Sequence, residues 1–427
     1  MQIHVVRPGE TLYSIARQYG VSVTLLGRLN QVPAGGALAV GQTLVVYEPE
    51  RVHVVRPGET LEGIARREGV SVLSLYQNNY FLGGRSRILP DEELIVALKG
   101  EKSGTLGVNG YAYTFIRQEQ LRTVLPYITY LTPFTYGVTS QGGLVVPDDG
   151  PLLAAAPQYG AQLWMHLSTL TDSGSFNSRL GGALLENETA QKALIDAVAA
   201  NMAEKGYQGL DVDFEYLEGR QAAAYTAFID ALRQRLNPLG WPVIVALAPK
   251  SSAEQRGLLY EAHDYAALSH AANAVLLMTY EWGYTAGPPM AVAPLPQVRR
   301  VLDYALTEMA PEKIFLGVPT YGYDWPLPFR QGITRAPSLS PQEALALARR
   351  YGAEIQYDET AQSPWFRYTA ETGTVHEVWF EDARSSLAKL RLAADNGLQG
   401  VGLWNLMRDA PQTYLVLNGA FQVEKLA

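Results

Sequence analysis

The sequence predicts an α/β protein: a (β/α)8 barrel with an α+β insertion between its seventh and eighth strands, preceded by two small βααβ modules. Two observations lead to this prediction. A segment near the N-terminus occurs twice, and beyond residue 106 eight short apolar runs alternate with helical stretches. The length of 427 residues agrees with this division, because a chain of that size exceeds one ordinary hydrophobic core.

The composition argues against several classes of protein. Hydrophobic residues make up 47% and charged residues 18%, which is typical of a folded globular chain. The net charge of −8 and the lack of any basic run argue against a nucleic-acid partner. With no cysteine and six scattered histidines, the chain is expected to hold no metal and no cofactor. Its sequence contains no run of about 18 apolar residues and no signal-peptide pattern, so we expect neither a membrane partner nor a signal peptide.

The repeated segment reads His-Val-Val-Arg-Pro-Gly-Glu-Thr-Leu and begins at His4 and again at His53. In each copy a short Val-Val strand ends at the Pro-Gly turn, and a threonine, Thr11 or Thr60, follows it. A threonine oxygen can accept a free N–H group at the start of a helix, so a helix is expected to begin there. A second short helix and a Leu-Val-Val or Leu-Ile-Val strand complete each βααβ module.

These repeats resemble the LysM peptidoglycan-binding module. The matching pieces are Pro-Gly-Glu-Thr-Leu, the asparagines Asn30 and Asn79, and the segment Val40-Gly41-Gln42-Thr43-Leu44. The resemblance implies two glycan-binding modules, which span residues 2–47 and 51–97. Tandem repeats also serve as spacers or protein-interaction modules, and the second repeat departs from the pattern at Pro90-Asp91-Glu92-Glu93, so its glycan binding stays open.

Residues 98–105 are polar and rich in glycine, and we interpret them as a short flexible linker to the barrel. The eight runs that suggest a closed parallel barrel lie within residues 106–427. They are Val108–Phe115, Ile128–Phe134, Gln162–Leu167, Gly209–Glu215, Val243–Pro249, Ala274–Glu281, Ile314–Tyr321 and Gly400–Asn405. The connection before the last run is far longer than such a loop requires, and its strand-like pieces predict an inserted subdomain over about 323–380.

Three carboxylic acids alternate along the fourth run: Asp211, Asp213 and Glu215. Alternate residues of a strand share a face, so the three acids point one way and the apolar residues between them the other. Inside a barrel such charges are costly and repel one another, which raises their pKa values and keeps a proton on the group. Glu215 comes last and so lies nearest the carboxyl end, where barrel active sites are found. A structural ion-pair cluster is the alternative, but no Lys or Arg lies nearby in sequence to pair with all three acids.

The segment around these acids, Gly209-Leu210-Asp211-Val212-Asp213-Phe214-Glu215, resembles the signature of glycoside hydrolase family 18. Leu277-Met278-Thr279-Tyr280-Glu281 and Val401-Gly402-Leu403-Trp404 resemble the sixth-strand and eighth-strand motifs of the same family. The resemblance implies substrate-assisted hydrolysis, in which the acetamide oxygen of the sugar attacks the anomeric carbon. Glu215 would be the general acid and base, Asp213 would orient the acetamide, Asp211 would tune Asp213, and Tyr280 would bind the acetamide carbonyl.

The resemblance also implies substrate-binding residues. Trp404 would stack under the reacting sugar and Met278 would pack beside it. Glu281 stands where the family usually has aspartate, which leaves its sugar contact in doubt, and Gln208 replaces the first aspartate of the broader signature. From their positions near the insertion, we expect Tyr321 and Trp379 to face the cleft as well.

LysM repeats joined to such a barrel without a signal peptide resemble the spore cortex-lytic and germination-associated N-acetylglucosaminidases. We therefore expect a monomeric enzyme of the spore cortex or coat, or of the cell wall. It would hydrolyse β-1,4 bonds at N-acetylglucosamine in peptidoglycan, with retention of configuration. Two alternatives remain: a chitinase with LysM targeting, and a non-catalytic glycan-binding spore coat protein. The presence of Glu215 argues against the second, because lectin-like relatives typically lose this acid.

Overall fold

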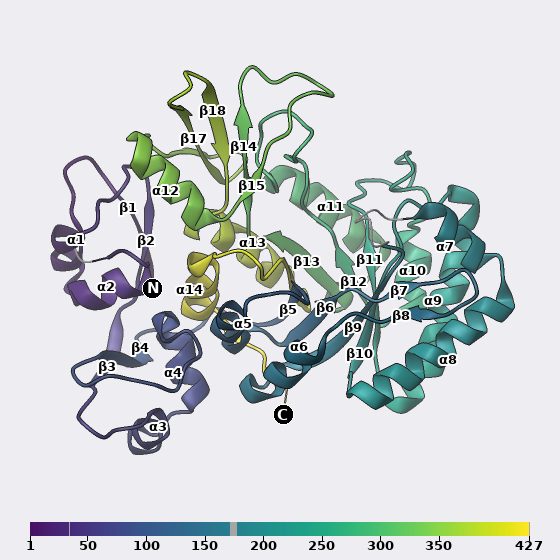
Figure 1. Cartoon of the computed structure of the whole chain (residues 1–427), viewed down its shortest axis with the longest axis horizontal. Helices are drawn as coiled ribbons and strands as arrows, with labels where there is room; N and C mark the ends of the chain where they lie inside the picture. Colours follow the sequence, from purple (N-terminus) through teal and green to yellow (C-terminus); the bar gives the residue numbers. More distant parts are fainter. Residues whose placement is uncertain (34, 171–176, 427) are drawn as a thin grey trace.

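The computed structural model describes residues 1–33, 35–170 and 177–426. Two small modules lie side by side against one flank of a large barrel, and an antiparallel sheet rises beside the barrel mouth (Figure 1). Within the described residues, no helix combines the length and the apolar character that crossing a bilayer requires.

Both N-terminal modules have the predicted βααβ order. The first contains β1 (Gln2–Val5), α1 (Leu12–Tyr19), α2 (Val23–Leu29) and β2 (Thr43–Val46). The second contains β3 (Pro49–Val54), α3 (Leu61–Glu68), α4 (Val72–Asn78), the 3-10 turn η1 (Tyr80–Leu82) and β4 (Glu93–Leu98). The expected helix caps are present, because Thr11 Oγ1 and Thr60 Oγ1 each accept a backbone N–H three residues ahead at 3.1 Å.

In the described part of the chain, eight parallel strands form the barrel, and each overlaps a predicted run, although β5 begins three residues before its run and β9 ends one residue after its own. They are β5 (Thr105–Tyr113), β6 (Tyr130–Phe134), β9 (Gln162–Ser168), β10 (Gly209–Asp213), β11 (Val243–Leu247), β12 (Ala274–Leu277), β13 (Ile314–Pro319) and β19 (Gly400–Trp404). The pairing of β19 with β5 closes the barrel. A short final strand, β20 (Gln422–Val423), pairs with the start of β5.

Helices cover the outer face of the barrel (Figure 1). They include α5 (Gln118–Val124), α6 (Gly150–Ala155), α7 (Ser178–Leu185), α8 (Glu188–Lys205), α9 (Ala222–Leu236), α10 (Tyr265–Ala271), α11 (Leu295–Glu308), α13 (Ala383–Asp395) and α14 (Pro411–Ala420). Alternation along β10 and just beyond it sends Leu210, Val212 and Phe214 into the layer beneath these helices, where Phe214 stacks on Tyr225 of α9. The acidic residues between them therefore face the barrel interior.

The predicted α+β insertion is confirmed. It contains β14 (Gly322–Pro326), β15 (Ser338–Leu339), α12 (Pro341–Tyr351), β16 (Gln356–Asp358), β17 (Ser363–Thr369) and β18 (Val375–Trp379). The strands form an antiparallel sheet in the order β15-β14-β18-β17-β16, and α12 packs on it through an apolar core that includes Leu345, Phe366 and Val378.

The modules are docked on α14 of the barrel through buried contacts. The side chain of Gln412 donates to the Thr43 carbonyl and accepts from the Thr43 hydroxyl, both at 2.6 Å. The Tyr47 hydroxyl donates to a carbonyl of α14 at 2.7 Å. The rings of Tyr80 and Tyr414 stack with centroids 5.8 Å apart. Buried groups of this kind fix two bodies together, because separation would expose both their apolar and polar surfaces.

The expected flexible linker is instead anchored to the barrel, and it is shorter than predicted. Leu98 belongs to β4 and Thr105 to β5, so only residues 99–104 connect the two strands. Within them, Lys102 Nζ donates to the Asn418 carbonyl at 2.6 Å and the Ser103 N–H to the Ala420 carbonyl at 2.7 Å. Local polarity suggested a free tether, but the contact with α14 is a long-range feature that local composition does not encode.

Replacing Gln412 with alanine tests this interface. The substitution leaves the buried Thr43 hydroxyl and carbonyl without partners, so we expect the free energy of unfolding to fall by about 1–3 kcal/mol. Urea denaturation of the full chain measures the change, with Gln18→Ala on the exposed face of α1 as the control. An unfolding midpoint equal to that of the control would contradict a tight interface.

Candidate active site

The three acids lie where β10 reaches the barrel mouth. Asp211 and Asp213 belong to the strand and are buried, while Glu215 lies just beyond the strand end and is partly open to a cavity. Strands β9 and β11 flank β10 on either side and bury its backbone. The arrangement agrees with the predicted order of depth, since Asp211 lies deepest and Glu215 nearest the mouth.

Burial dominates the titration of the deepest acid. It raises the pKa of Asp211 to about 7, although a hydrogen bond from the Tyr111 hydroxyl to Asp211 Oδ2 at 2.5 Å opposes the shift. The second oxygen, Oδ1, has no hydrogen-bond partner among the described residues. An aspartate in this setting binds a proton at a pH at which an exposed aspartate is ionised.

Asp213 and Glu215 interact strongly with each other. Burial raises the pKa of both groups, and the negative charges of Glu215 and Asp211 raise the pKa of Asp213 further. Like charges this close disfavour double ionisation, so the pair retains a proton near neutral pH. A carboxylic acid that stays protonated at the mouth of a cavity can donate that proton to a bound molecule.

His166 is a neighbour that the sequence reasoning missed. It lies on β9 in register with Asp211, and its Nε2 is 3.7 Å from Asp213 Oδ2. Burial lowers the pKa of His166 to about 3, so the imidazole is neutral and does not cancel the negative charge of the acids. Its Nδ1 is hydrogen-bonded to the Thr135 hydroxyl at 2.6 Å. The β9–β10 register could have revealed this neighbour, but register is not visible in the sequence.

The acids open into a cavity of about 550 Å³. It brings together six of the predicted residues with an aromatic wall that was not predicted. The predicted ones besides Asp213 are Glu215, Met278, Tyr280, Glu281 and Trp404, and the additional ones include Phe134, Tyr216, Tyr260, Trp282 and Tyr284. Trp404 packs edge-on against Phe134, with ring centroids 4.9 Å apart, which fixes its orientation. Flat apolar rings beside hydrogen-bonding acids are suited to sugars, which have apolar faces and polar edges.

Glu281 is held by two tyrosines of the neighbouring β13–β14 region. The Tyr321 hydroxyl donates to Glu281 Oε1, and the Tyr323 hydroxyl donates to the same oxygen at 2.9 Å. Burial raises the pKa of Glu281 in spite of these hydrogen bonds. Tyr321 is thus buried behind Glu281 and positions it, rather than lining the cavity as expected.

Trp379 was expected to bind substrate, but it does not line this cavity. Its indole N–H donates to Glu377 Oε1 at 2.7 Å, and its ring stacks on Trp365 of the neighbouring strand with centroids 5.7 Å apart. Cross-strand stacking within the insertion sheet therefore determines its orientation. In the residues that the structure describes, no group of three or more His, Asp or Glu side chains is placed to hold a metal ion.

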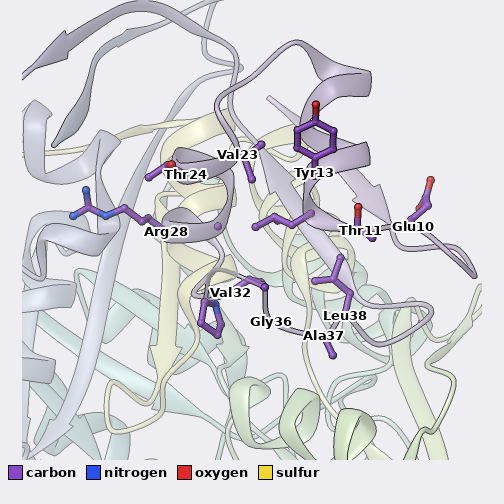
Figure 2. Close-up of a pocket in the computed structure, with 14 residues that line it drawn as sticks. Glu10, Thr11, Tyr13, Val23, Thr24, Arg28, Val32, Gly36, Ala37 and Leu38 are labelled. Atoms are coloured by element: carbon purple, nitrogen blue, oxygen red, sulfur yellow. The ribbon is translucent and has the colours of Figure 1, made fainter. Parts of the chain in front are cut away.

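The first module contains a second cavity, also of about 550 Å³, between the start of α1, helix α2 and the loop that follows α2. Figure 2 shows Tyr13 and Thr11 on one side, Val23, Thr24 and Arg28 from α2, and Gly36, Ala37 and Leu38 from the loop. The lining is largely apolar with a few hydroxyl groups. This groove is the candidate ligand site of the module.

The closed barrel, with buried acids beside an aromatic cavity, has the architecture of a glycoside hydrolase. Comparison with known families agrees: residues 171–409 match the model of glycosyl hydrolases family 18, and residues 4–46 and 53–97 match the LysM domain. The chain belongs to glycosyl hydrolases family 18 and carries two N-terminal LysM domains.

Its relatives share the whole architecture. Over its full length the chain is 40% identical to a cortical fragment-lytic enzyme of Bacillus subtilis, with 99% of that protein covered. The crystal structure of the spore cortex-lytic enzyme SleL of Bacillus megaterium superposes with a TM-score of 0.85 at 35% identity, covering 100% of this chain and 99% of that one. SleL of Bacillus cereus gives a TM-score of 0.85 at 33% identity, with 99% and 98% covered.

The raised pKa of Asp211 predicts how stability depends on pH. Folding is penalised where the buried carboxyl must ionise, so its stabilising contribution is complete below about pH 4 and is lost as the pH rises to about 7. Asp211→Asn keeps an acceptor for Tyr111 and removes the charge. At pH 7.5 we expect the free energy of unfolding to rise by roughly 1–4 kcal/mol, with little change near pH 4.

Urea denaturation across this pH range measures the effect. The control is Asp303→Asn, which removes an exposed carboxylate on α11. A variant with the same pH dependence as the unmodified protein would contradict the raised pKa.

Proposed function

We propose that this protein hydrolyses β-1,4 bonds next to N-acetylglucosamine in fragments of spore cortex peptidoglycan. One observation carries the proposal: Asp213 and Glu215 line an aromatic cavity in a chain that matches a cortical fragment-lytic enzyme from end to end. The LysM domains support a peptidoglycan substrate, since the groove of the first module offers a second place for the same glycan. The relatives also support a location in the spore.

In the proposed mechanism, Glu215 is the general acid. Its raised pKa keeps it protonated at the cavity wall, from which it donates to the glycosidic oxygen as the bond breaks. Asp213 lies beneath it and accepts a hydrogen bond from the acetamide N–H of the sugar. As Glu215 loses its proton, the repulsion between the two carboxylates grows. The new negative charge on Glu215 raises the pKa of Asp213, so Asp213 holds a proton more tightly. Asp211 keeps the pKa of Asp213 high through its own charge.

The acetamide carbonyl oxygen of the bound sugar would serve as the nucleophile. Burial and the nearby acids raise the pKa of Tyr280 well above its usual value, so its hydroxyl stays protonated and can donate to that carbonyl. Glu215 then acts as a base toward water, and the configuration at the anomeric carbon is retained. This mechanism requires a free acetamide on the sugar that is attacked. A sugar whose nitrogen is closed into a lactam has none, so cleavage is favoured at N-acetylglucosamine.

The aromatic wall would position the sugar for this reaction. Trp404 supplies a flat ring for stacking, and Met278 fills the side of the cavity. Glu281 would accept hydrogen bonds from sugar hydroxyls mainly through Oε2, because Oε1 receives both the Tyr321 and the Tyr323 hydroxyl, while Oε2 has only a longer contact of 3.2 Å to the Tyr323 hydroxyl. No cofactor takes part in the proposed reaction, and one chain supplies all of the groups named, which is compatible with a monomer.

The general-acid role is tested with soluble cortex fragments. Glu215→Gln preserves shape but cannot donate a proton, so we expect turnover to fall by about 10²–10⁴-fold. Mass spectrometry of the products is expected to show N-acetylglucosamine at the new reducing ends. Since the reaction requires protonated Glu215, the rate of the unmodified enzyme falls as the pH rises through about 7.

Glu204→Gln, an exposed change on α8, is the matched control. Near-normal turnover by Glu215→Gln would contradict the assignment. Faster cleavage of chitin oligosaccharides than of cortex fragments would favour a LysM-targeted chitinase. No turnover by the unmodified enzyme would favour a glycan-binding coat protein.

The role of the sugar acetamide as nucleophile can be tested by inhibition. A thiazoline analogue of the oxazolinium-type intermediate should compete with substrate, because it presents the same bicyclic shape to Asp213 and Tyr280. Inhibition kinetics measure this, with the parent sugar as the control. A covalent sugar on an Asp or Glu side chain, trapped with a fluorosugar and seen by intact-protein mass spectrometry, would instead identify a protein nucleophile.

A further inference from the structure

The two LysM modules are built alike, which allows their surfaces to be compared position by position. Asn30 Nδ2 donates to the carbonyls of Leu26 and Val45, and Asn79 Nδ2 donates in the same way to those of Leu75 and Ile95. The asparagines therefore align α2 with α4. In this alignment Gly27 and Arg28 of the first module correspond to Tyr76 and Gln77 of the second.

In the first module these positions line the open groove. Gly27 and Arg28 are both lining residues of the groove, and Figure 2 shows Arg28 on α2. Gly35, in the loop beyond α2, also lines the groove, and its backbone has positive φ. Chain neighbours aside, a Cβ atom at Gly35 would meet no atom of the described residues within 4 Å.

In the second module two corresponding positions of the helix are in contact with the barrel. The Tyr76 ring packs against Tyr159, with centroids 5.8 Å apart. Gln77 is only 7% exposed, and its Nε2 donates to the Pro126 carbonyl at 2.8 Å. The Tyr127 hydroxyl donates to the Gln77 carbonyl at 2.9 Å. Helix α4 thus packs against the barrel through Tyr76 and Gln77, which correspond to two of the positions that line the groove in α2.

The loop after α4 shows the same contrast. Gly84 corresponds to Gly35 and also has positive φ, but its carbonyl accepts the Tyr159 hydroxyl at 2.7 Å. A Cβ atom at Gly84 would lie 2.2 Å from the carbonyl oxygen of Arg122, a distance that no side chain tolerates. The backbone of this loop is therefore pressed against the barrel.

Glu92 and Glu93, where the second repeat differs from the LysM pattern, contact the first module. Glu92 Oε1 accepts from Arg28 Nη2 at 2.9 Å, and Glu93 Oε2 accepts from the Ser22 hydroxyl at 2.5 Å. The Arg28 guanidinium also lies over the Phe81 ring, 3.8 Å from its centroid. These side chains bind the first module to the second.

We infer that only the first LysM module binds glycan, and that the second is an adaptor whose glycan-facing surface is occupied by the barrel. This inference rests on the proposed glycan function of the first groove. It predicts that the tandem repeat gives no gain from bivalent binding, because one site per chain cannot engage two sugars. The first module is also fixed to the insertion, where the Ile355 N–H donates to the Val40 carbonyl at 2.9 Å.

Matched substitutions at corresponding positions test the inference. In the first module, Tyr13→Ala with Thr24→Arg removes a groove side chain and fills the groove. In the second, Glu62→Ala with Leu73→Arg changes the corresponding positions. Both pairs are made in the full chain carrying Glu215→Gln, which prevents digestion, and sedimentation with insoluble peptidoglycan measures the apparent affinity. We expect a loss of about tenfold or more for the first pair and less than about twofold for the second.

Equal losses from the two pairs, or a larger loss from the second, would overturn the inference. Thermal unfolding verifies that each variant is folded. As a second measurement, Gln77→Ala and Tyr159→Phe should lower the melting temperature yet leave wall binding unchanged; weakened binding at an unchanged melting temperature would also overturn it. If the chain with Glu215→Gln alone does not sediment, neither module binds glycan and the inference fails, whereas hydrolysis of soluble fragments by the unmodified enzyme tests the catalytic proposal separately.

Discussion

The burial of three carboxylic acids on one strand is the constraint on which the rest of the site depends. An apolar barrel interior penalises their ionised forms, and the nearest imidazole, His166, is itself neutral and does not offset the charge. The result is a set of acids that holds protons at neutral pH. The same desolvation lowers the stability of the fold as the pH rises from about 4 to about 7, so catalytic capacity and stability are opposed here.

Apolar packing around the acids offsets the free-energy cost of burying them. The residues that alternate with the acids are apolar and lie in the main core, and Phe214 stacks against α9. One segment thus supplies both the reactive acids and part of the packing that supports them. A similar division occurs at Glu281, whose carboxylate reaches the cavity while Tyr321 and Tyr323 hold it from behind.

The two modules have the same local structure but differ in what packs against them. They begin with the same residues and have the same helix caps, yet one keeps a free groove and the other packs that surface on the barrel. The difference comes from what lies against each module. The docking of module on module and of both on the barrel places the first groove at a fixed position relative to the catalytic cavity, so a ligand in that groove would be held near the cavity without a flexible tether.

The sequence by itself determined the strand runs of the barrel, the βααβ modules with caps at Thr11 and Thr60, the insertion and the acidic signature, because periodicity, capping and alternation are local properties of the chain. Only the tertiary structure decided that His166 faces Asp213, that Tyr321 lies behind Glu281, that Trp379 stacks outside the cavity and that the modules dock on α14. Each of these contacts joins segments distant in sequence, and each depends on strand register or on docking surfaces that local pattern does not specify.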